Sequence, residues 1–238
     1  MPDAWVPDLI DQRVCHIGVV DSGYSSCLHS PVKSATAFVI EGDQLWQSDE
    51  AIDQLGHGTR VIEVIHALAP GAVIHSAKVF GAVGTTTALQ VAVAIDWLVD
   101  QGVDMINLSL GLRNDRPVLR QSCERALERG VLLCASSPAQ GAAVFPAAIP
   151  GVIRATGDAR CGHHDLVWLD TVQADVAGCV LPMSKQRGLS GASMGCAHVI
   201  GHLGRLLSQG SDLRLDTVRE VLSTTARWHG REYKTYGS

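Results

Sequence analysis

The chain has 238 residues, of which 46% are hydrophobic and 18% are charged, enough apolar material for the core of one large domain or two small ones. Its formal net charge of −5 at pH 7 argues against a general nucleic-acid binder, because such proteins usually carry an excess of basic residues. No apolar run reaches the roughly 18 residues of a membrane span, and the first residues lack the basic and apolar regions of a secretory signal. We therefore expect neither a nucleic-acid nor a membrane partner.

Seven cysteines are scattered along the chain, and no two of them are spaced as Cys-x-x-Cys. A zinc ribbon is therefore not expected, and Cys15 and Cys134 fall in apolar runs of strand type where thiols are usually buried. No acidic cluster has the spacing of a calcium site. The sequence predicts a reduced, cytoplasmic protein that holds no metal or cofactor and folds without calcium or disulfides.

Strand-like and helix-like segments alternate along most of the chain. Apolar runs of β type cover residues 14–20, 73–79, 102–108, 131–135 and 151–155. Apolar residues at helical spacing predict helices at 57–69, 88–99, 117–129, 199–207 and 215–226. Residues 158–183 have the pattern of irregular strands and turns.

This alternation predicts an α/β fold, a three-layer doubly wound and mostly parallel sheet with helices on both faces. No internal repeat or linker is visible, so one domain is expected over residues 1–238. Within it, residues 1–13 are expected to form an N-terminal extension and residues 227–238 a C-terminal tail.

Two polar residues stand at element ends where catalytic groups are often found. Asp21 follows the first strand, and a carboxylate at the carboxyl end of a buried parallel strand often belongs to an active site. An Asx turn that closes the strand is at least as common. His57 begins the first helix, where the helix dipole opposes protonation and favours the neutral imidazole of a general base. A histidine beside glycines is, however, more often a turn residue.

A Gly-rich turn that runs into a helix covers residues 188–207 and contains Ser193. The first backbone N–H groups of a helix are unpaired and, with the dipole, favour negative charge nearby. Acyl transfer from a serine nucleophile develops an oxyanion beside that serine. The alternative is a serine near a helix N-cap, which is a common arrangement.

Three short motifs carry these polar residues: Asp21 in Val-Val-Asp-Ser-Gly, His57 in Gly-His-Gly-Thr and Ser193 in Gly-Ala-Ser-Met. Their order along the chain is typical of the subtilisin-like serine proteases, the subtilases. The chain resembles this family over nearly its whole length. The resemblance implies a subtilisin-like fold and peptide-bond cleavage in which Ser193 attacks, His57 transfers the proton and Asp21 orients the imidazole. Further segments that match family landmarks are 103–111, 145–147 and 175–177.

The same resemblance implies a substrate-binding region. An extended peptide would pair with one backbone segment, and a second segment would form one wall of the primary specificity pocket. These residues are Ser109, Leu110 and Gly111 in the first segment and Ser136, Ser137 and Pro138 in the second.

The chain departs from the family pattern at the oxyanion region. Ala139 stands where the family has an asparagine that donates to the oxyanion, and Ser137 and Gln140 are the nearby side chains that could donate instead. Ala197 replaces the proline that usually follows the serine. The chain is also short for the family, with no evident pro-segment and trimmed calcium-binding loops.

These features favour a specialised cytoplasmic serine endopeptidase that acts on a peptide or protein substrate, such as a precursor peptide cut once. The alternative is a subtilase-fold module that binds a peptide or partner protein with weak or no catalysis. An unrelated doubly wound protein with chance motifs is a third reading. Labelling with a fluorophosphonate serine probe distinguishes a working enzyme from the other two.

Overall fold

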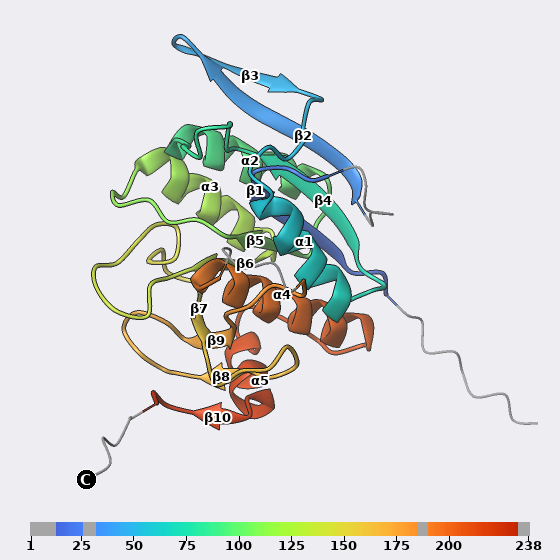
Figure 1. The fold of residues 1–238 in the computed structure, drawn as a ribbon, viewed down its shortest axis with the longest axis vertical. Helices are drawn as coiled ribbons and strands as arrows, with labels where there is room; N and C mark the ends of the chain where they lie inside the picture. The colour runs from blue at the N-terminus through green and yellow to red at the C-terminus, as the bar shows by residue number, and fades with distance from the viewer. Residues whose placement is uncertain (1–12, 26–31, 185–189, 233–238) are drawn as a thin grey trace, which may run out of the picture.

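The computed structural model describes residues 13–25, 32–184 and 190–232. Within these residues, a ten-stranded sheet has the order β10-β8-β9-β7-β6-β5-β1-β4-β2-β3 (Figure 1). Its central strands pair in parallel, which confirms the mostly parallel sheet predicted from the sequence. These strands are β1 (His16–Asp21), β4 (Val73–Lys78), β5 (Met105–Leu108), β6 (Leu132–Ser136), β7 (Ile153–Asp158) and β9 (Val176–Cys179).

Helices cover both faces of the sheet and produce the three predicted layers (Figure 1). On one face, α1 (His57–Leu68), α4 (Ala192–Ser208) and α5 (Val218–Thr225) share a core that includes Ile62 and Leu203. On the other face, α2 (Ala88–Asp100) and α3 (Pro117–Glu128) share a second core that includes Ile95 and Leu119. Because successive strand residues point to opposite faces, β1 contributes to both cores, which explains its continuous apolar run.

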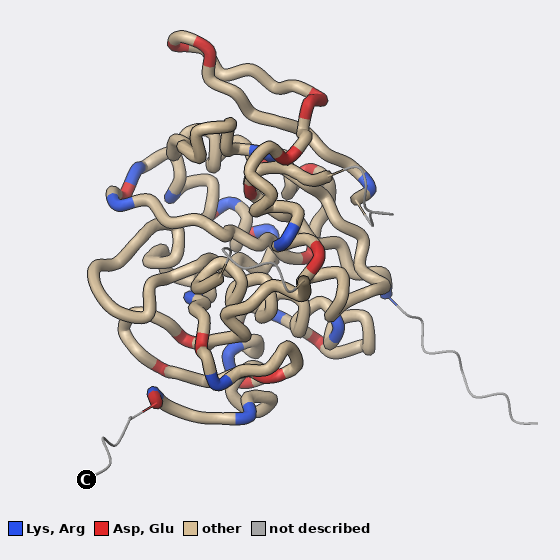
Figure 2. Tube along the Cα trace, viewed as in Figure 1, with Lys and Arg blue, Asp and Glu red and all other residues tan. Residues whose placement is uncertain are grey.

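Two strands at one edge of the sheet were not predicted. β2 (Val32–Glu41) pairs in parallel with β4 and turns at Gly42 into β3 (Gln44–Ser48), which pairs antiparallel with it. The hairpin extends away from the helical layers, and acidic residues lie near its tip (Figures 1 and 2). Its exposed and polar residues interrupt the apolar pattern that identifies a buried strand. Elsewhere in Figure 2, basic and acidic residues are interspersed over the molecule.

The opposite edge falls partly in the predicted irregular region and partly in the predicted tail. β8 (Val167–Trp168) pairs antiparallel with β9, and β10 (Trp228–His229) pairs in parallel with β8. Residues 228–229 of the predicted tail are therefore part of the sheet. Residues 233–238 lie outside the described residues, as do residues 1–12 of the predicted extension.

Helix α4 begins seven residues before the expected start at residue 199, so Ser193 lies in its first turn. The small residues there gave no apolar periodicity, but they let the helix approach the sheet closely. A Cβ atom on Gly195 would lie 2.0 Å from the carbonyl oxygen of Thr156 in β7. Residues 188–189 of the Gly-rich stretch lie outside the described residues.

The burial of two cysteines agrees with the sequence-based expectation. Cys15 and Cys134 are fully buried, as predicted, whereas Cys27 lies outside the described residues. No helix in the described part of the chain is long and apolar enough to cross a bilayer.

Candidate active site

The fold brings Asp21 and His57 into direct contact. Asp21 ends β1 and His57 begins α1, and His57 Nδ1 lies 2.7 Å from Asp21 Oδ1. The same oxygen accepts the backbone N–H of Ser22 at 2.7 Å, and the Asp21 side chain is only 1% exposed. Because a carboxylate only accepts hydrogen bonds, His57 Nδ1 carries the hydrogen and Nε2 keeps a lone pair that can accept a proton.

The electrostatics of His57 differ from the expectation drawn from its helix position. Burial disfavours its charged form, but the hydrogen bond and charge of Asp21, with the charge of Asp53, outweigh burial and raise the pKa of His57 above 6.5. The carboxylate partner and Asp53 therefore favour the protonated imidazole. The arrangement stabilises an imidazolium, the state that a general base reaches after taking a proton.

Asp53, which was not among the residues predicted for the site, holds the start of α1. Its carboxylate accepts the backbone N–H groups of Leu55, Gly56 and Thr59 at 2.8–3.0 Å and the hydroxyl of Thr59 at 2.7 Å. It also accepts the Ser22 hydroxyl at 2.8 Å, which joins the loop after Asp21 to the helix that carries His57. An aspartate just ahead of a predicted helix start was the available signal.

Burial opposes ionisation of Asp53, but its hydrogen bonds with Thr59, Ser22 and Gly56 outweigh burial and lower its pKa. The ionised carboxylate therefore supplies the negative charge that the N-terminus of α1 favours. The Ser22 hydroxyl in turn accepts the backbone N–H of Gly58 at 2.9 Å. These contacts fix His57 relative to the strand that ends in Asp21.

Ser193 contacts the segment that follows β5. Its hydroxyl donates to the carbonyl oxygen of Ser109 at 3.2 Å, and the Ser109 hydroxyl donates to the carbonyl oxygen of Ser193 at 3.3 Å. Asn107, fully buried in β5, donates from Nδ2 to the Ser109 hydroxyl at 2.8 Å. Among the described residues, no hydrogen bond joins Ser193 to His57, so the Ser193 hydroxyl would have to leave Ser109 to donate to the imidazole.

A cavity of about 390 Å³ lies beside His57 and reaches Ser109, the hydrogen-bond partner of Ser193, although Ser193 itself does not line it. The predicted catalytic pair Asp21 and His57 and the predicted substrate residue Ser109 all line it. Leu55 and Phe80 supply apolar walls. A peptide side chain that enters this cavity would lie against the imidazole of His57. It would also lie beside Ser109, whose carbonyl oxygen accepts the Ser193 hydroxyl.

The predicted substrate segment is largely buried up to Gly111. Ser109 and Leu110 are 5% and 6% exposed, and Gly111 is exposed. The next residue, Leu112, exchanges two backbone hydrogen bonds with Phe145, at 2.7 and 2.8 Å. This isolated bridge ties the end of the predicted substrate segment to Phe145.

The second predicted segment is tied into the protein by its hydroxyl groups. Ser136 donates to the carbonyl oxygen of Leu110 at 3.3 Å, and Ser137 donates to the carbonyl oxygen of Gln173 at 2.6 Å. Ser137 is 4% exposed, so its hydroxyl is already committed to Gln173. Pro138 follows at the half-buried end of the segment.

Ala139 and Gln140, the residues of the predicted oxyanion region, are exposed. They line a cavity of about 280 Å³ together with Thr156, Gly157 and Asp158 of β7. Of the two side chains considered as substitute donors, Gln140 is the one without a hydrogen bond inside the described part of the chain.

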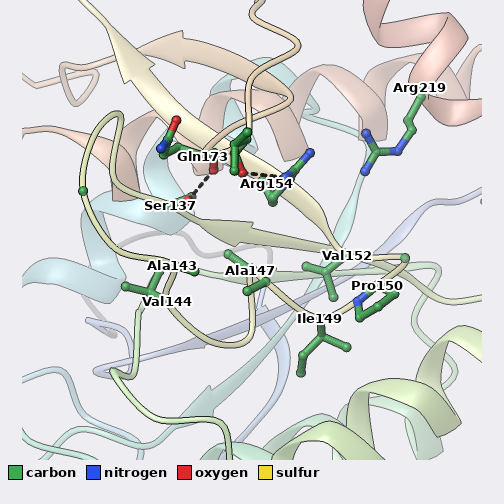
Figure 3. Close-up of a pocket in the computed structure, with 14 residues that line it drawn as sticks. Ser137, Ala143, Val144, Ala147, Ile149, Pro150, Val152, Arg154, Gln173 and Arg219 are labelled. Atoms are coloured by element: carbon green, nitrogen blue, oxygen red, sulfur yellow. Dashed lines mark hydrogen bonds between the residues drawn. The ribbon is translucent and has the colours of Figure 1, made fainter.

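A larger cavity of about 420 Å³ is lined in part by Ser137 (Figure 3). Ala147 lines its apolar part, and Arg154 and Arg219 lie at its polar end. Both arginines pair with Asp175, which is fully buried. None of the three predicted catalytic residues lines this cavity.

Comparisons with known proteins agree with this architecture. The family model described as the subtilase family matches residues 13–152. The chain is 28% identical to subtilisin DY from Bacillus licheniformis, over 88% of this chain and 82% of that protein. It is 29% identical to subtilisin Savinase from Lederbergia lenta, over 93% of this chain and 86% of that protein.

A solved structure of a cold-adapted subtilisin-like serine proteinase superposes with a TM-score of 0.66 at 22% identity. The match covers 90% of this chain and 84% of that one. At this identity the likeness concerns the fold, and it agrees with the parallel sheet and its two helical layers.

Proposed function

The chain belongs to the subtilase family of serine proteases, and from this membership we propose that Asp21, His57 and Ser193 are its catalytic residues. The observation that carries the proposal is the 2.7 Å contact between the buried Asp21 carboxylate and His57 Nδ1. It leaves His57 Nε2 free to accept a proton at the cavity that Ser109, the hydrogen-bond partner of Ser193, also lines. The enzyme is a serine endopeptidase.

In the proposed reaction, the Ser193 hydroxyl moves from the Ser109 carbonyl to His57 and attacks the carbonyl carbon of a peptide bond. His57 takes the hydroxyl proton and then gives it to the leaving amine, and Asp21 stabilises the imidazolium in between. The backbone N–H of Ser193 donates to the oxyanion from the first turn of α4. Water then releases the acyl group by the reverse proton transfers.

The proposed substrate is an extended peptide segment of a protein or precursor, processed at one or few sites inside the cytoplasm. Residues 109–111 would pair with its backbone, and residues 136–138 would flank the side chain before the cleaved bond. Two features support a specialised role. Ala139 supplies no side-chain donor to the oxyanion, which slows general proteolysis. The six cysteines within the described residues are buried as free thiols, which suits a reducing compartment.

The test is cleavage of a diverse peptide mixture, read by mass spectrometry as the sequences on both sides of each cut. We expect internal cleavage at a narrow set of sites by the parent protein and none by Ser193→Ala or His57→Ala. Ser208→Ala, which changes a serine near the far end of α4, is the matched control and should retain the parent profile. Equal cleavage by Ser193→Ala would exclude the proposed nucleophile, and cuts at many unrelated sequences would exclude a specialised role.

A further inference from the structure

Three side chains of metal-binding type converge at a place that the proposed reaction does not use. His163 comes from the loop between β7 and β8, Cys179 ends β9, and His198 lies in α4. One ligand atom from each lies within 4.8 Å of the others. We propose that these three residues bind a transition-metal ion of the Zn²⁺ type.

The hydrogen bonding of His198 directs the lone pair of its Nε2 atom toward this cluster. His198 Nδ1 lies 2.9 Å from the carbonyl oxygen of Met194, and a carbonyl only accepts, so Nδ1 carries the hydrogen. The lone pair is therefore on Nε2, which lies 3.2 Å from His163 Nδ1 and accepts the hydrogen of that nitrogen. A bound ion would take the place of this hydrogen, and His163 would then carry its hydrogen on Nε2. An imidazole that donates its second nitrogen to a backbone carbonyl is the usual arrangement of a metal-bound histidine, because that bond fixes the ring and its tautomer.

The spacing fits a tetrahedral ion. Zinc bonds of about 2.0–2.1 Å to nitrogen and about 2.3 Å to sulfur place neighbouring ligand atoms roughly 3.3–3.6 Å apart. The two imidazole nitrogens are already 3.2 Å apart, with their rings stacked at an interplanar angle of 11°. All three ligand atoms lie within 4.8 Å of one another, so the side chains would have to move only slightly for one ion to bind all three.

The donor set and its surroundings select the kind of ion. Two imidazoles and one thiolate suit Zn²⁺ and its transition-metal neighbours and do not suit Ca²⁺ or Mg²⁺, which prefer oxygen. Cys179 Sγ accepts the backbone N–H of Leu181 at 3.5 Å, but burial outweighs this bond and raises the pKa of the thiol, so a bound ion would have to displace its proton. His198 and Cys179 are 0% and 2% exposed, whereas His163 is half-buried and gives an ion a route from solvent.

Such an ion would link the loop after β7 and the end of β9 to the helix that carries Ser193. The three ligands come from separate elements that already pack tightly, since a Cβ atom on Gly178 would lie 2.7 Å from the Cβ of His198. Three protein ligands leave one position of a tetrahedron for water. The site would thus stabilise α4 without taking part in the proposed proton transfers.

The experiment uses the full chain after treatment with a chelator, titrated with Zn²⁺ in competition with a chromophoric chelator and separately with Co²⁺. We expect one ion per chain, a thiolate-to-cobalt charge-transfer band in the near ultraviolet, and a melting temperature that rises with added Zn²⁺. His163→Ala and Cys179→Ser should each weaken Zn²⁺ binding at least about tenfold, and Cys179→Ser should lose the cobalt band.

The matched controls are His164→Ala, an exposed histidine next to His163, and Cys123→Ser, a buried cysteine in α3. Both should bind Zn²⁺ as the parent does. The absence of stoichiometric binding by the parent would overturn the proposal. So would parent-like affinity in both His163→Ala and Cys179→Ser, since binding would then involve other residues, such as His202 one turn further along α4.

Discussion

At the scale of single residues, the contact between Asp21 and His57 fixes how activity should depend on pH. His57 must be neutral to accept the Ser193 proton, and its pKa is raised above 6.5 because Asp21 and Asp53 outweigh burial. We therefore expect kcat/KM to fall as the pH is lowered through an apparent pKa above 6.5. The measurement is a pH profile of kcat/KM on one peptide substrate.

The cause of the raised His57 pKa can be tested without measuring catalysis. In a Ser193→Ala background, an NMR titration of His57 should show the same raised pKa, and adding Asp21→Asn should lower it, since burial then dominates. A His57 pKa below 6.5 with Asp21 intact would contradict this account.

Ala139 is the residue at which the oxyanion prediction can be tested. Removing one oxyanion donor costs about 10²–10³ in kcat, a figure known from subtilisin. Ala139→Asn should therefore raise kcat several-fold or more with little change in KM, because the new hydrogen bond forms mainly in the transition state. Steady-state kinetics of the two proteins on one substrate is the measurement.

Two neighbouring substitutions show whether another donor already acts there. Ser137→Ala should change stability more than kcat, since the Ser137 hydroxyl donates to Gln173. A strong loss of kcat in Gln140→Ala, together with no gain in Ala139→Asn, would mean that Gln140 replaces the missing donor and that the enzyme is not slow for this reason.

Side-chain partners are also where sequence reasoning reached its limit. The order of Asp21, His57 and Ser193 could be read from their motifs, but the commitment of Ser137 to Gln173 could not, because these residues meet only in the folded chain. The convergence of His163, Cys179 and His198 escaped for the same reason. Each comes from a separate element, so no local spacing marks the cluster.

At the scale of elements, Asp53 couples the start of α1 to the loop after β1. Asp53→Ala removes the acceptor of three backbone N–H groups and two hydroxyls and should destabilise the protein by about 2–3 kcal/mol. It should also lower kcat more than it raises KM, since His57 would be less well positioned. Urea unfolding and steady-state kinetics measure the two effects.

Asp49→Ala is the matched control, because Asp49 is exposed and precedes the same helix. It should unfold within about 0.5 kcal/mol of the parent. Equal behaviour of the two variants would show that Asp53 does not hold α1.

Elements with continuous apolar runs or clear helical spacing were predicted close to their observed bounds. The first strand, expected at 14–20, is His16–Asp21, and the second helix, expected at 88–99, is Ala88–Asp100. The start of α4 and the β2–β3 hairpin were not predicted. The start of α4 depends on close packing of small residues, and the hairpin depends on the pairing of β2 with β4 at the sheet edge. Neither feature produces a periodic pattern of apolar residues in the sequence.

At the scale of the whole molecule, buried neutral histidines make the fold sensitive to acid. Burial, with smaller effects of His16 and Lys33, lowers the pKa of His75 to about 4, and burial also lowers that of His202 to about 4. The unfolded chain takes up these protons near pH 6.5, so it binds more protons than the folded chain between the two values. Stability should therefore be complete above pH 6.5 and fall as the pH drops toward 4.

Urea unfolding at about pH 7 and about pH 5 measures this loss, which amounts to about 1.4 kcal/mol per pH unit for each such histidine. His75→Asn should reduce the difference between the two conditions. His229→Asn, at an exposed position, should leave it unchanged. Equal stability of the parent at both pH values would contradict the buried neutral state.

The most direct test of the whole account is the site of covalent labelling by a fluorophosphonate, located by peptide mass spectrometry. The account predicts one adduct per chain, on Ser193, that is lost in His57→Ala and strongly reduced in Asp21→Asn, since the hydroxyl is activated by His57 and the imidazole is oriented by Asp21. An adduct on another serine, or a folded parent protein that takes up no probe, would contradict it.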